Sequence, residues 1–323
     1  MYFCHPRQKE VIFSGQRSPD RSVFCIFIRR NVQFSKANDK CPTCEKERKK
    51  GKYPVLGYNV RRQMVYRSLF FSLTLHPQSI VNLVIDIGNT LAKLVAFDGD
   101  TPVDEMKTSN ETLEALPAFL QKHPFRQGIT GSVIHIPAEA ERQIRQAGIP
   151  MLRLDANTPI PIHNDYHTPE TLGADRLAAA VGAYTLCPGR DVLIIDAGTC
   201  LTFDFIDRHG HYRGGSISPG LQMRLKALHA FTSRLPLTDS EGDAPEVGCD
   251  TETCIRSGVV QGIKCEIEGR IEQFRTKCPN LLVFLTGGDK FHFDSKIKNL
   301  IFADKYIVPR GLNSILTFNN EQL

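Results

Sequence analysis

Val84-Ile85-Asp86-Ile87-Gly88-Asn89-Thr90 is followed, 110 positions later, by the related stretch Ile194-Ile195-Asp196-Ala197-Gly198-Thr199-Cys200. Each is an apolar run that ends in Asp-x-Gly and leads through small polar residues into a second strand-like run. Such a turn suits a metal-bound phosphate, because glycine lets the phosphate approach the backbone N–H groups while the carboxylate faces the cation. Two such turns facing each other across a cleft predict a phosphotransferase that holds a nucleotide between two related domains.

Predicted strands and helices alternate around the two copies. Two strand–turn–strand units are expected, at residues 82–97 and 191–207. The other predicted strands are residues 127–136, 150–154, 212–217 and 281–285. The predicted helices are residues 110–122, with Asn110 as N-cap, and residues 138–147, 172–186, 219–230 and 252–276. A β-rich opening followed by helix–strand alternation, repeated once, predicts an α/β protein with two domains of like topology, placed at residues 81–187 and 188–323.

The composition is that of an ordinary globular protein, with 41% hydrophobic and 23% charged residues among 323. The longest stretch without a formal charge, residues 68–85, contains His, Pro, Gln and Asn and is therefore no membrane span. The first ten residues lack the pattern of a signal peptide. The six cysteines from Cys187 onward show no framework spacing, which is typical of reduced thiols and predicts a cytoplasmic protein.

The first eighty residues differ from the rest in charge. Residues 1–80 hold 16 Lys and Arg against 5 Asp and Glu, whereas the remainder holds 24 against 30. A solvated tail is favoured over a nucleic-acid contact, and Cys41–Cys44 is interpreted as a chance CxxC because structural zinc sites normally pair two close-spaced couples. We expect this extension to be disordered or to precede a natural start at Val81. Its deletion is then expected to leave an active protein.

Other motifs offer groups for chemistry. In Gly173-Ala174-Asp175-Arg176, Asp175 is suited to accept a hydroxyl proton while Arg176 binds an anion; the alternative is an Asp serving the helix dipole beside a solvated Arg. Thr202 and Asp204 have the even spacing that places two side chains on one face of a strand. Two glycine-rich turns are candidates for phosphate or nucleoside contact, or plain connections: Gly214–Gly220 and Thr286–Asp289.

Taken together in their order and spacing, these motifs resemble the type III pantothenate kinases, a branch of the acetate and sugar kinase, Hsp70 and actin superfamily. The resemblance runs from about Asn82 to Leu312. It implies two RNase H-like (actin-like ATPase) domains with ATP in the cleft between them. It also implies a homodimer that phosphorylates the primary hydroxyl of pantothenate, the first step of coenzyme A biosynthesis, with neither membrane nor nucleic acid as a partner.

The same resemblance implies the roles of individual residues. Asp175 is the expected general base, and Asp196 is the expected ligand of a monovalent cation, K⁺ or NH₄⁺, beside Mg²⁺-ATP. The residues expected to bind ATP are Asp86, Ile87, Gly88, Asn89, Thr90, Leu91, Ala92, Lys93 and Thr199. The residues expected to bind pantothenate are Tyr166, Gly173, Ala174, Asp175, Arg176 and Thr251. The sequence does not decide whether Arg176 meets the pantothenate carboxylate or a phosphate oxygen.

Two other functions compete with this interpretation. Another enzyme of the superfamily, such as a sugar kinase or an exopolyphosphatase, is disfavoured because more basic residues are expected between Tyr166 and Arg176 in a polyphosphate enzyme. A non-catalytic regulator that binds nucleotide, or nucleic acid through the basic extension, is disfavoured by the presence of all three aspartates: Asp86, Asp175 and Asp196.

Overall fold

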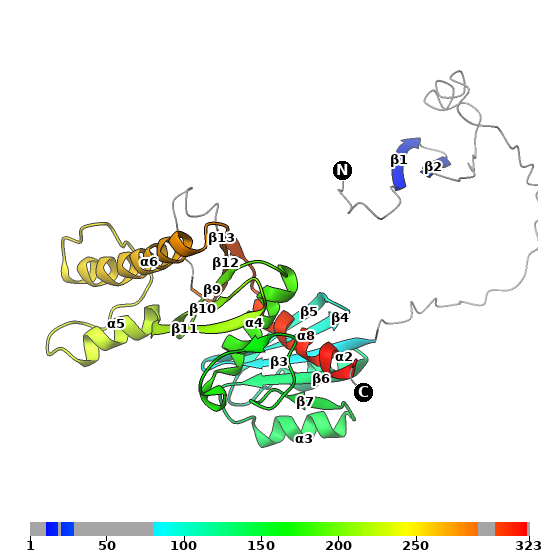
Figure 1. Cartoon of the computed structure of the whole chain (residues 1–323), viewed down its shortest axis with the longest axis horizontal. Coiled ribbons are helices and arrows are strands. Elements are labelled where there is room, and N and C mark those ends of the chain that lie inside the picture. Colours follow the sequence, from blue (N-terminus) through cyan, green and yellow to red (C-terminus); the bar gives the residue numbers. More distant parts are fainter. Residues whose placement is uncertain (1–10, 19–20, 29–79, 290–300, 322–323) are drawn as a thin grey trace, which may run out of the picture. The chain divides into compact units, whose positions relative to one another are not determined.

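The computed structural model describes residues 11–18, 21–28, 80–289 and 301–321 (Figure 1). The chain divides into two compact units, Met1–Leu73 and Thr74–Leu323. In the first unit, β1 (Val11–Ser18) and β2 (Arg21–Ile28) form an antiparallel hairpin. The predicted chance pair Cys41–Cys44 lies outside the described residues.

The second unit contains two mixed sheets of the same topology. The strand order is β5-β4-β3-β6-β7 in the first sheet and β13-β12-β9-β10-β11-β8 in the second. If β8 is left aside, the first strand of each sheet along the chain, β3 or β9, is central, antiparallel to the strand that follows it and parallel to the strand on its other side. Numbered along the chain, both sheets therefore have the order 3-2-1-4-5, with β8 added at one edge of the second. This repetition confirms the predicted α/β fold with two related halves.

The elements of the two halves follow one another along the chain. The first half holds β3 (Val81–Ile87), β4 (Leu91–Asp98), β5 (Thr101–Ser109), α2 (Leu116–Lys122), β6 (Phe125–Ser132), α3 (Ala138–Gln146) and β7 (Met151–Arg153). The connection holds β8 (His163–Asn164), the 3₁₀ turn η1 (Pro169–Thr171) and α4 (Ala174–Leu186). The second half holds β9 (Val192–Ala197), β10 (Cys200–Ile206), β11 (His211–Pro219), α5 (Leu221–Ala230), α6 (Thr251–Lys277), β12 (Leu282–Gly287), β13 (Ile301–Ala303) and α8 (Ile307–Asn320).

Three hydrophobic clusters stack these elements in layers, as Figure 1 shows. Helices α2 and α3 cover the outer face of the first sheet, and α5 and α6 cover the outer face of the second. Helices α4 and α8 fill the space between the two sheets. The predicted boundary between residues 187 and 188 remains a prediction, and α8, at the end of the second half, contacts β3 and β6 of the first as well as α4.

The alternation of side chains along each central strand sets which residues face the inner layer. In β9, Leu193 and Ile195 belong to the outer cluster, whereas Ile194 belongs to the inner one. In β3, Ile85 belongs to the outer cluster and Val84 to the inner one. Successive side chains along a strand point to opposite faces. Asp86 and Asp196, near the ends of these two strands, therefore face the inner layer, where α4 begins.

Helix α2 begins later than predicted. The expected helix over residues 110–122 starts only at Leu116, and residues 110–115 form turns. The predicted N-cap, Asn110, is wrong because its side chain is drawn away: it is buried and its Nδ2 donates to the Gly88 carbonyl at 3.0 Å. Tertiary contact with the first Asp-x-Gly turn has therefore overridden the local capping signal.

Candidate active site

The two Asp-x-Gly turns meet at the C-terminal ends of β3 and β9. The Gly88 N–H donates to the Leu91 carbonyl at 3.1 Å, and the Gly198 N–H donates to the Cys200 carbonyl at 3.0 Å. The hydroxyl oxygens of Thr90 and Thr199, one from each turn, lie 3.1 Å apart. Turns that are more than a hundred residues apart in the chain are thus in direct contact, as the prediction of one shared site requires.

Asp86 is buried in this site and faces one lysine. It lies opposite Lys93 in the β3–β4 register, and its Oδ2 is 3.9 Å from the Lys93 ammonium. Burial raises the pKa of Asp86 to about 6, and the charge of Asp175 adds to this rise, whereas Lys93 opposes it. Any additional positive charge nearby would therefore stabilise the ionised form of Asp86.

Asp196 is in the same electrostatic environment. Burial raises its pKa to about 7, Lys93 opposes the rise, and the carboxylates of Asp175, Asp86 and Asp204 add to it. Opposite Asp196 in the β9–β10 register stands Thr202, which brings no charge. Among the described residues, the site therefore brings the carboxylates of Asp86, Asp175 and Asp196 near one another, and Lys93 offsets Asp86 and Asp196. Within the described part of the chain, no three His, Cys, Asp or Glu side chains form a ready-made metal cage.

Asp175 lies in the first turn of α4. Its Oδ1 accepts a hydrogen bond from the Arg176 backbone N–H at 2.8 Å, so the carboxylate folds over the start of its own helix. A Cβ on Gly173 would lie 2.5 Å from that oxygen, so a side chain at this position would require the Asp175 carboxylate to move. The Asp175 carboxylate therefore lies beside the partial positive charge of a helix N-terminus.

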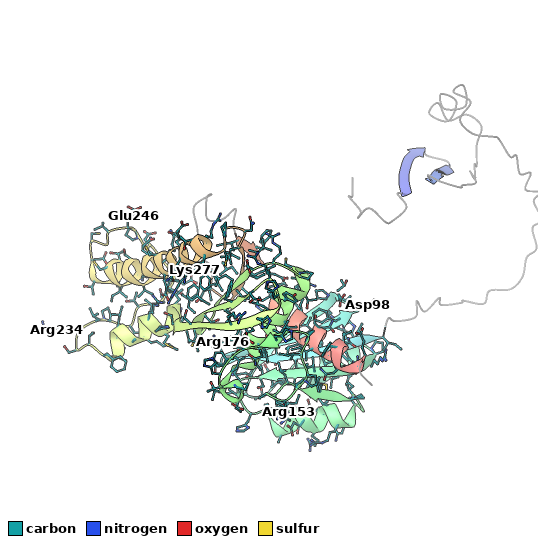
Figure 2. All side chains as sticks on the ribbon, in the orientation of Figure 1. Asp98, Arg153, Arg176, Arg234, Glu246 and Lys277 are labelled. Atoms are coloured by element: carbon teal, nitrogen blue, oxygen red, sulfur yellow. The ribbon has the colours of Figure 1, made fainter. Side chains whose placement is uncertain are left out.

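Arg176 is buried rather than solvated, so the alternative of a solvated arginine is wrong. Its Nη2 and Nε lie 2.6 Å and 3.0 Å from Asp204 Oδ1, and the Tyr212 hydroxyl donates to the same oxygen at 2.6 Å. Burial would lower the pKa of Arg176, but the hydrogen bond and charge of Asp204 outweigh burial and raise it. The guanidinium also lies over the Tyr166 ring, 5.8 Å from its centroid. Figure 2 shows Arg176 between the two sheets.

A pocket of about 470 Å³ adjoins the start of α4. Its wall combines the ends of β6 and β7 with the turn that precedes α4. It is lined on one side by Ser132 and Val133 and on the other by Gly173 and Ala174. Its charged lining residues are Asp155 and Glu170, both acidic. This wall suits a neutral, partly apolar group with hydroxyls better than an anion.

The sequence-predicted site residues are brought together with one exception. Thr251 is the first residue of α6, behind a capping box formed by Asp250 and Thr253. The start of α6 lies at the end of that helix away from the sheets, and Glu246, whose carbonyl accepts from Ser257 of α6, is far from Arg176 (Figures 1 and 2). Within one chain, Thr251 is therefore not beside Asp175.

Sequence reasoning missed how two residues support the turns, because it interpreted Asn110 as a helix cap and Gly220 as part of the glycine-rich Gly214–Gly220 turn. The Asn110 side chain holds the Gly88 carbonyl, and the Gly220 N–H donates to the Thr199 carbonyl at 3.2 Å. A Cβ on Gly220 would lie 2.2 Å from the Gly198 carbonyl oxygen. Their spacing held a signal: both residues follow the third strand of their half, 110 positions apart, as the two turns are.

This fold of two related α/β halves, with the Asp175 carboxylate near two Asp-x-Gly turns, is the arrangement expected of a phosphotransferase. Comparison with known proteins gives the family. The sequence profile of the type III pantothenate kinases matches residues 82–273, and the chain belongs to that family.

Curated relatives agree along their whole length. A type III pantothenate kinase of Bacteroides fragilis is 52% identical over 243 residues, which cover 75% of this chain and 100% of the relative. Those of Phocaeicola vulgatus and Porphyromonas gingivalis are 48% and 39% identical and cover 75% and 74% of this chain, and 100% and 98% of their own lengths. Among solved structures, a ROK family glucokinase of Streptomyces griseus aligns with 74% of this chain and 98% of its own length. The sequence identity is 12% and the TM-score is 0.37, a likeness too low to support a conclusion about function.

Proposed function

We propose that this protein transfers the γ-phosphoryl group of ATP to the primary hydroxyl of pantothenate, giving 4′-phosphopantothenate in the first step of coenzyme A biosynthesis. Membership of the type III pantothenate kinase family supports this activity. The structural observation that carries it is the contact between Thr90 and Thr199, since it joins the two Asp-x-Gly turns at 3.1 Å. Phosphoryl transfer depends mainly on positioning and on charge neutralisation, and two such turns supply both.

Each residue of the site has a role in this reaction. Asp175 accepts the proton of the pantothenate hydroxyl, and Asp196 binds the monovalent cation. The stretch that binds the ATP phosphates is Asp86–Lys93, joined by Thr199 from the second turn. The residues that bind pantothenate are Tyr166, Gly173, Ala174, Asp175, Arg176 and Thr251. What supports these roles is the convergence of the turns and the start of α4 on the inner layer.

The donors in the site fit the cations that the family implies. Carboxylate oxygens suit Mg²⁺ and K⁺. Among the described residues, Lys93 is the lysine that offsets Asp86 and Asp196, and their pKa values nevertheless remain raised, to about 6 and about 7. Mg²⁺, when bound with ATP, neutralises phosphate charge. Asp196 is the better site for a monovalent cation, because the strand opposite it presents Thr202 rather than a lysine.

The pocket beside α4 fits the end of pantothenate that reacts. That end consists of a primary hydroxyl, a gem-dimethyl carbon and a second hydroxyl, which is neutral and branched. The walls mix apolar residues such as Val133 and Leu177 with polar groups, and the acidic Asp155 and Glu170 disfavour a carboxylate there. We therefore place the hydroxyl end of the substrate in this pocket and its carboxylate outside it.

A homodimer explains the position of Thr251. The start of α6 is distant from Asp175 of the same chain, so Thr251 reaches a pantothenate site only if that site belongs to a second copy. The segment between α5 and α6 also exposes large apolar side chains, with Phe231 89% and Val247 84% exposed. Apolar surface of this kind favours burial in an interface.

The location that we propose is the cytoplasm, where ATP is available. The six described cysteines, from Cys187 to Cys278, are free thiols, in keeping with a reducing compartment. No helix among the described residues combines the length and apolar character needed to cross a bilayer.

A coupled ADP-release assay tests the function. The full chain with Mg²⁺-ATP is expected to release ADP only when pantothenate is added, and faster with K⁺ than without it. Asp175→Asn is expected to abolish turnover while ATP still binds, because the asparagine fills the same volume but cannot accept the proton. A folded wild-type chain that binds ATP and releases no ADP with pantothenate would instead favour a nucleotide-binding regulator.

A further inference from the structure

A buried polar network ties α4 to the second sheet. It consists of Arg176 on α4, Asp204 on β10 and Tyr212 on β11, which are 8%, 1% and 0% exposed. The guanidinium approaches the carboxylate along its Nε–Nη2 edge, with Nη2 at 2.6 Å and Nε at 3.0 and 3.2 Å from the two oxygens. The Tyr212 hydroxyl donates to Oδ1 at 2.6 Å. The second terminal nitrogen of Arg176, Nη1, takes no part in this pair.

The network also holds the segment that carries Tyr166. The Tyr166 ring lies under the Arg176 guanidinium, and its centroid is 6.1 Å from that of Tyr212. Gly214 on β11 has a φ of +88°, and a Cβ there would lie 3.3 Å from the Tyr166 ring. Two residues with proposed pantothenate contacts are therefore set against β10 and β11 by one cluster of contacts.

Backbone geometry links the network to the proposed base. The Arg176 N–H donates to the Asp175 carboxylate at 2.8 Å, so the orientation of the Asp175 side chain depends on where Arg176 is held. Asp204 lies on the inner face of β10, because Leu201 and Phe203 belong to the outer cluster and Ile206 to the inner one. Asp204 thus faces α4 from β10 and holds the first turn of that helix through Arg176.

A contribution to stability does not by itself explain why this network of buried charged groups is present. Removing two charges from water is costly, and replacing a buried ion pair by apolar residues is often neutral or stabilising. A buried ion pair is better explained when it holds neighbouring residues in one geometry. Here the geometry is that of Asp175, Arg176 and Tyr166, three residues that the proposed reaction uses.

We propose that Asp204 and Tyr212 are positioning residues for phosphoryl transfer, which hold the Nε–Nη2 edge of Arg176 so that Asp175 is oriented and the Nη1–Nη2 end of the guanidinium is left to face the substrate anion. This inference rests on the proposed pantothenate kinase activity. It assigns no contact with substrate to Asp204 or Tyr212. It leaves the two Nη1 hydrogens and the second Nη2 hydrogen of Arg176 for the substrate, because Asp204 takes only the Nε–Nη2 edge.

Two variants of the full chain test the proposal by steady-state kinetics. Tyr212→Phe removes one hydrogen bond to a charged group and keeps the ring, and kcat/KM for pantothenate is expected to fall about tenfold. Asp204→Asn leaves the Arg176 charge unbalanced, and the same ratio is expected to fall about a hundredfold. In both variants the Kd for ATP, measured by calorimetry, is expected to stay within about twofold of wild type, because the two turns are untouched.

Asp191→Asn is the matched control. Asp191 is a buried carboxylate paired with Arg208, whose Nη2 is 2.6 Å from its Oδ2, at the opposite end of β9 and β10 from the site. Its loss is expected to lower thermal stability while kcat/KM for pantothenate, per folded molecule, stays at the wild-type value. A purely structural network would make Asp204→Asn and Tyr212→Phe behave in the same way as this control.

The outcomes separate this proposal from the function on which it rests. Wild type that turns over, with a selective loss of pantothenate kcat/KM in Tyr212→Phe, supports it. Wild type that turns over, with Tyr212→Phe and folded Asp204→Asn both at wild-type kcat/KM, overturns the proposal and leaves the kinase intact. Wild type that shows no pantothenate-dependent ADP release overturns the proposed function, and the positioning role falls with it.

Discussion

The two halves of the molecule repeat one hairpin, and they differ in the residue opposite the aspartate. In the first half Asp86 is paired in register with Lys93, whereas in the second half Asp196 is paired with Thr202. Both carboxylates are buried, but the pKa rises to about 6 for Asp86 and to about 7 for Asp196. The first hairpin thus pairs its aspartate with a lysine and the second does not, although Lys93 opposes the rise in pKa of both carboxylates.

The supports of the two turns differ in the same way. The first turn is held by a side chain, since Asn110 donates to the Gly88 carbonyl at 3.0 Å. The second is held by backbone, since Gly220 donates to the Thr199 carbonyl at 3.2 Å and closes tightly on Gly198. The two turns therefore share an architecture and differ in the residues that support it.

Removing either aspartate is expected to have the largest effect. Asp86→Asn and Asp196→Asn are each expected to lower kcat by at least about a hundredfold, because each removes a fixed charge from the phosphoryl-transfer site. The comparison predicts one difference between them: Asp86→Asn keeps its response to K⁺, and Asp196→Asn loses it. Rates measured over a K⁺ titration check this, and equal K⁺ responses in the two variants would contradict the assignment of the cation to Asp196.

Exchanging the opposing residue is the sharpest test of the comparison. Thr202→Lys gives the second hairpin the charge of the first, and turnover is expected to become independent of K⁺ within about twofold, since the ammonium offsets Asp196. Thr202→Met, of similar length and without charge, is the control and is expected to remain responsive to K⁺. ADP release with and without K⁺ is the measurement. Persistence of the full K⁺ response in a folded Thr202→Lys protein would count against the role of Thr202.

The pH dependence of stability should separate the two carboxylates. Because the folded-state pKa of Asp196 is raised to about 7 from 3.8, the folded chain holds this proton more tightly than the unfolded chain does. Stability from this group is therefore full below about pH 4 and is lost as pH rises to about 7. Without ligands, Asp196→Asn is expected to be more stable than wild type at pH 8, by on the order of 3 kcal/mol, and not at pH 4.

Asp86→Asn is expected to gain less at pH 8, because its removal also leaves Lys93 without a partner at 3.9 Å. Denaturant unfolding of ligand-free wild type and of both variants at the two pH values makes the comparison. An equal gain for both variants would show that Lys93 does not distinguish the two carboxylates.

The contact between the turns is expected to give the smallest effect. Thr90→Val and Thr199→Val each remove one hydroxyl of the pair that lies 3.1 Å apart, and the KM for ATP is expected to rise about threefold in each. The double variant is expected to be little worse than either single one, because both substitutions remove the same hydrogen bond. Strictly additive losses would show that the two hydroxyls act separately.

Much of the fold could be predicted because the signals were local. The strand–turn–strand units and the helices α3, α4, α5 and α6 follow from hydrophobic period and turn residues, and they agree with the structure within a few residues. The start of α2 was wrong because Asn110 was interpreted as a cap, and its real partner, Gly88, is 22 residues away. Strand β5 and helix α8 were not predicted as separate elements.

The sequence by itself determined that this chain has two Asp-x-Gly turns, an Asp–Arg pair at a helix start and the motif order of a pantothenate kinase, since these are matters of residue type and spacing. Only the tertiary structure decided what stands opposite each aspartate. The second hairpin is one residue shorter, so equal spacing would place Phe203 opposite Asp196, whereas the register places Thr202 there. Likewise the edge of Arg176 that meets Asp204 was set by the packing of α4 on β10 and β11. Pairing across strands and between layers depends on the path of the chain in space, which residue spacing alone does not fix.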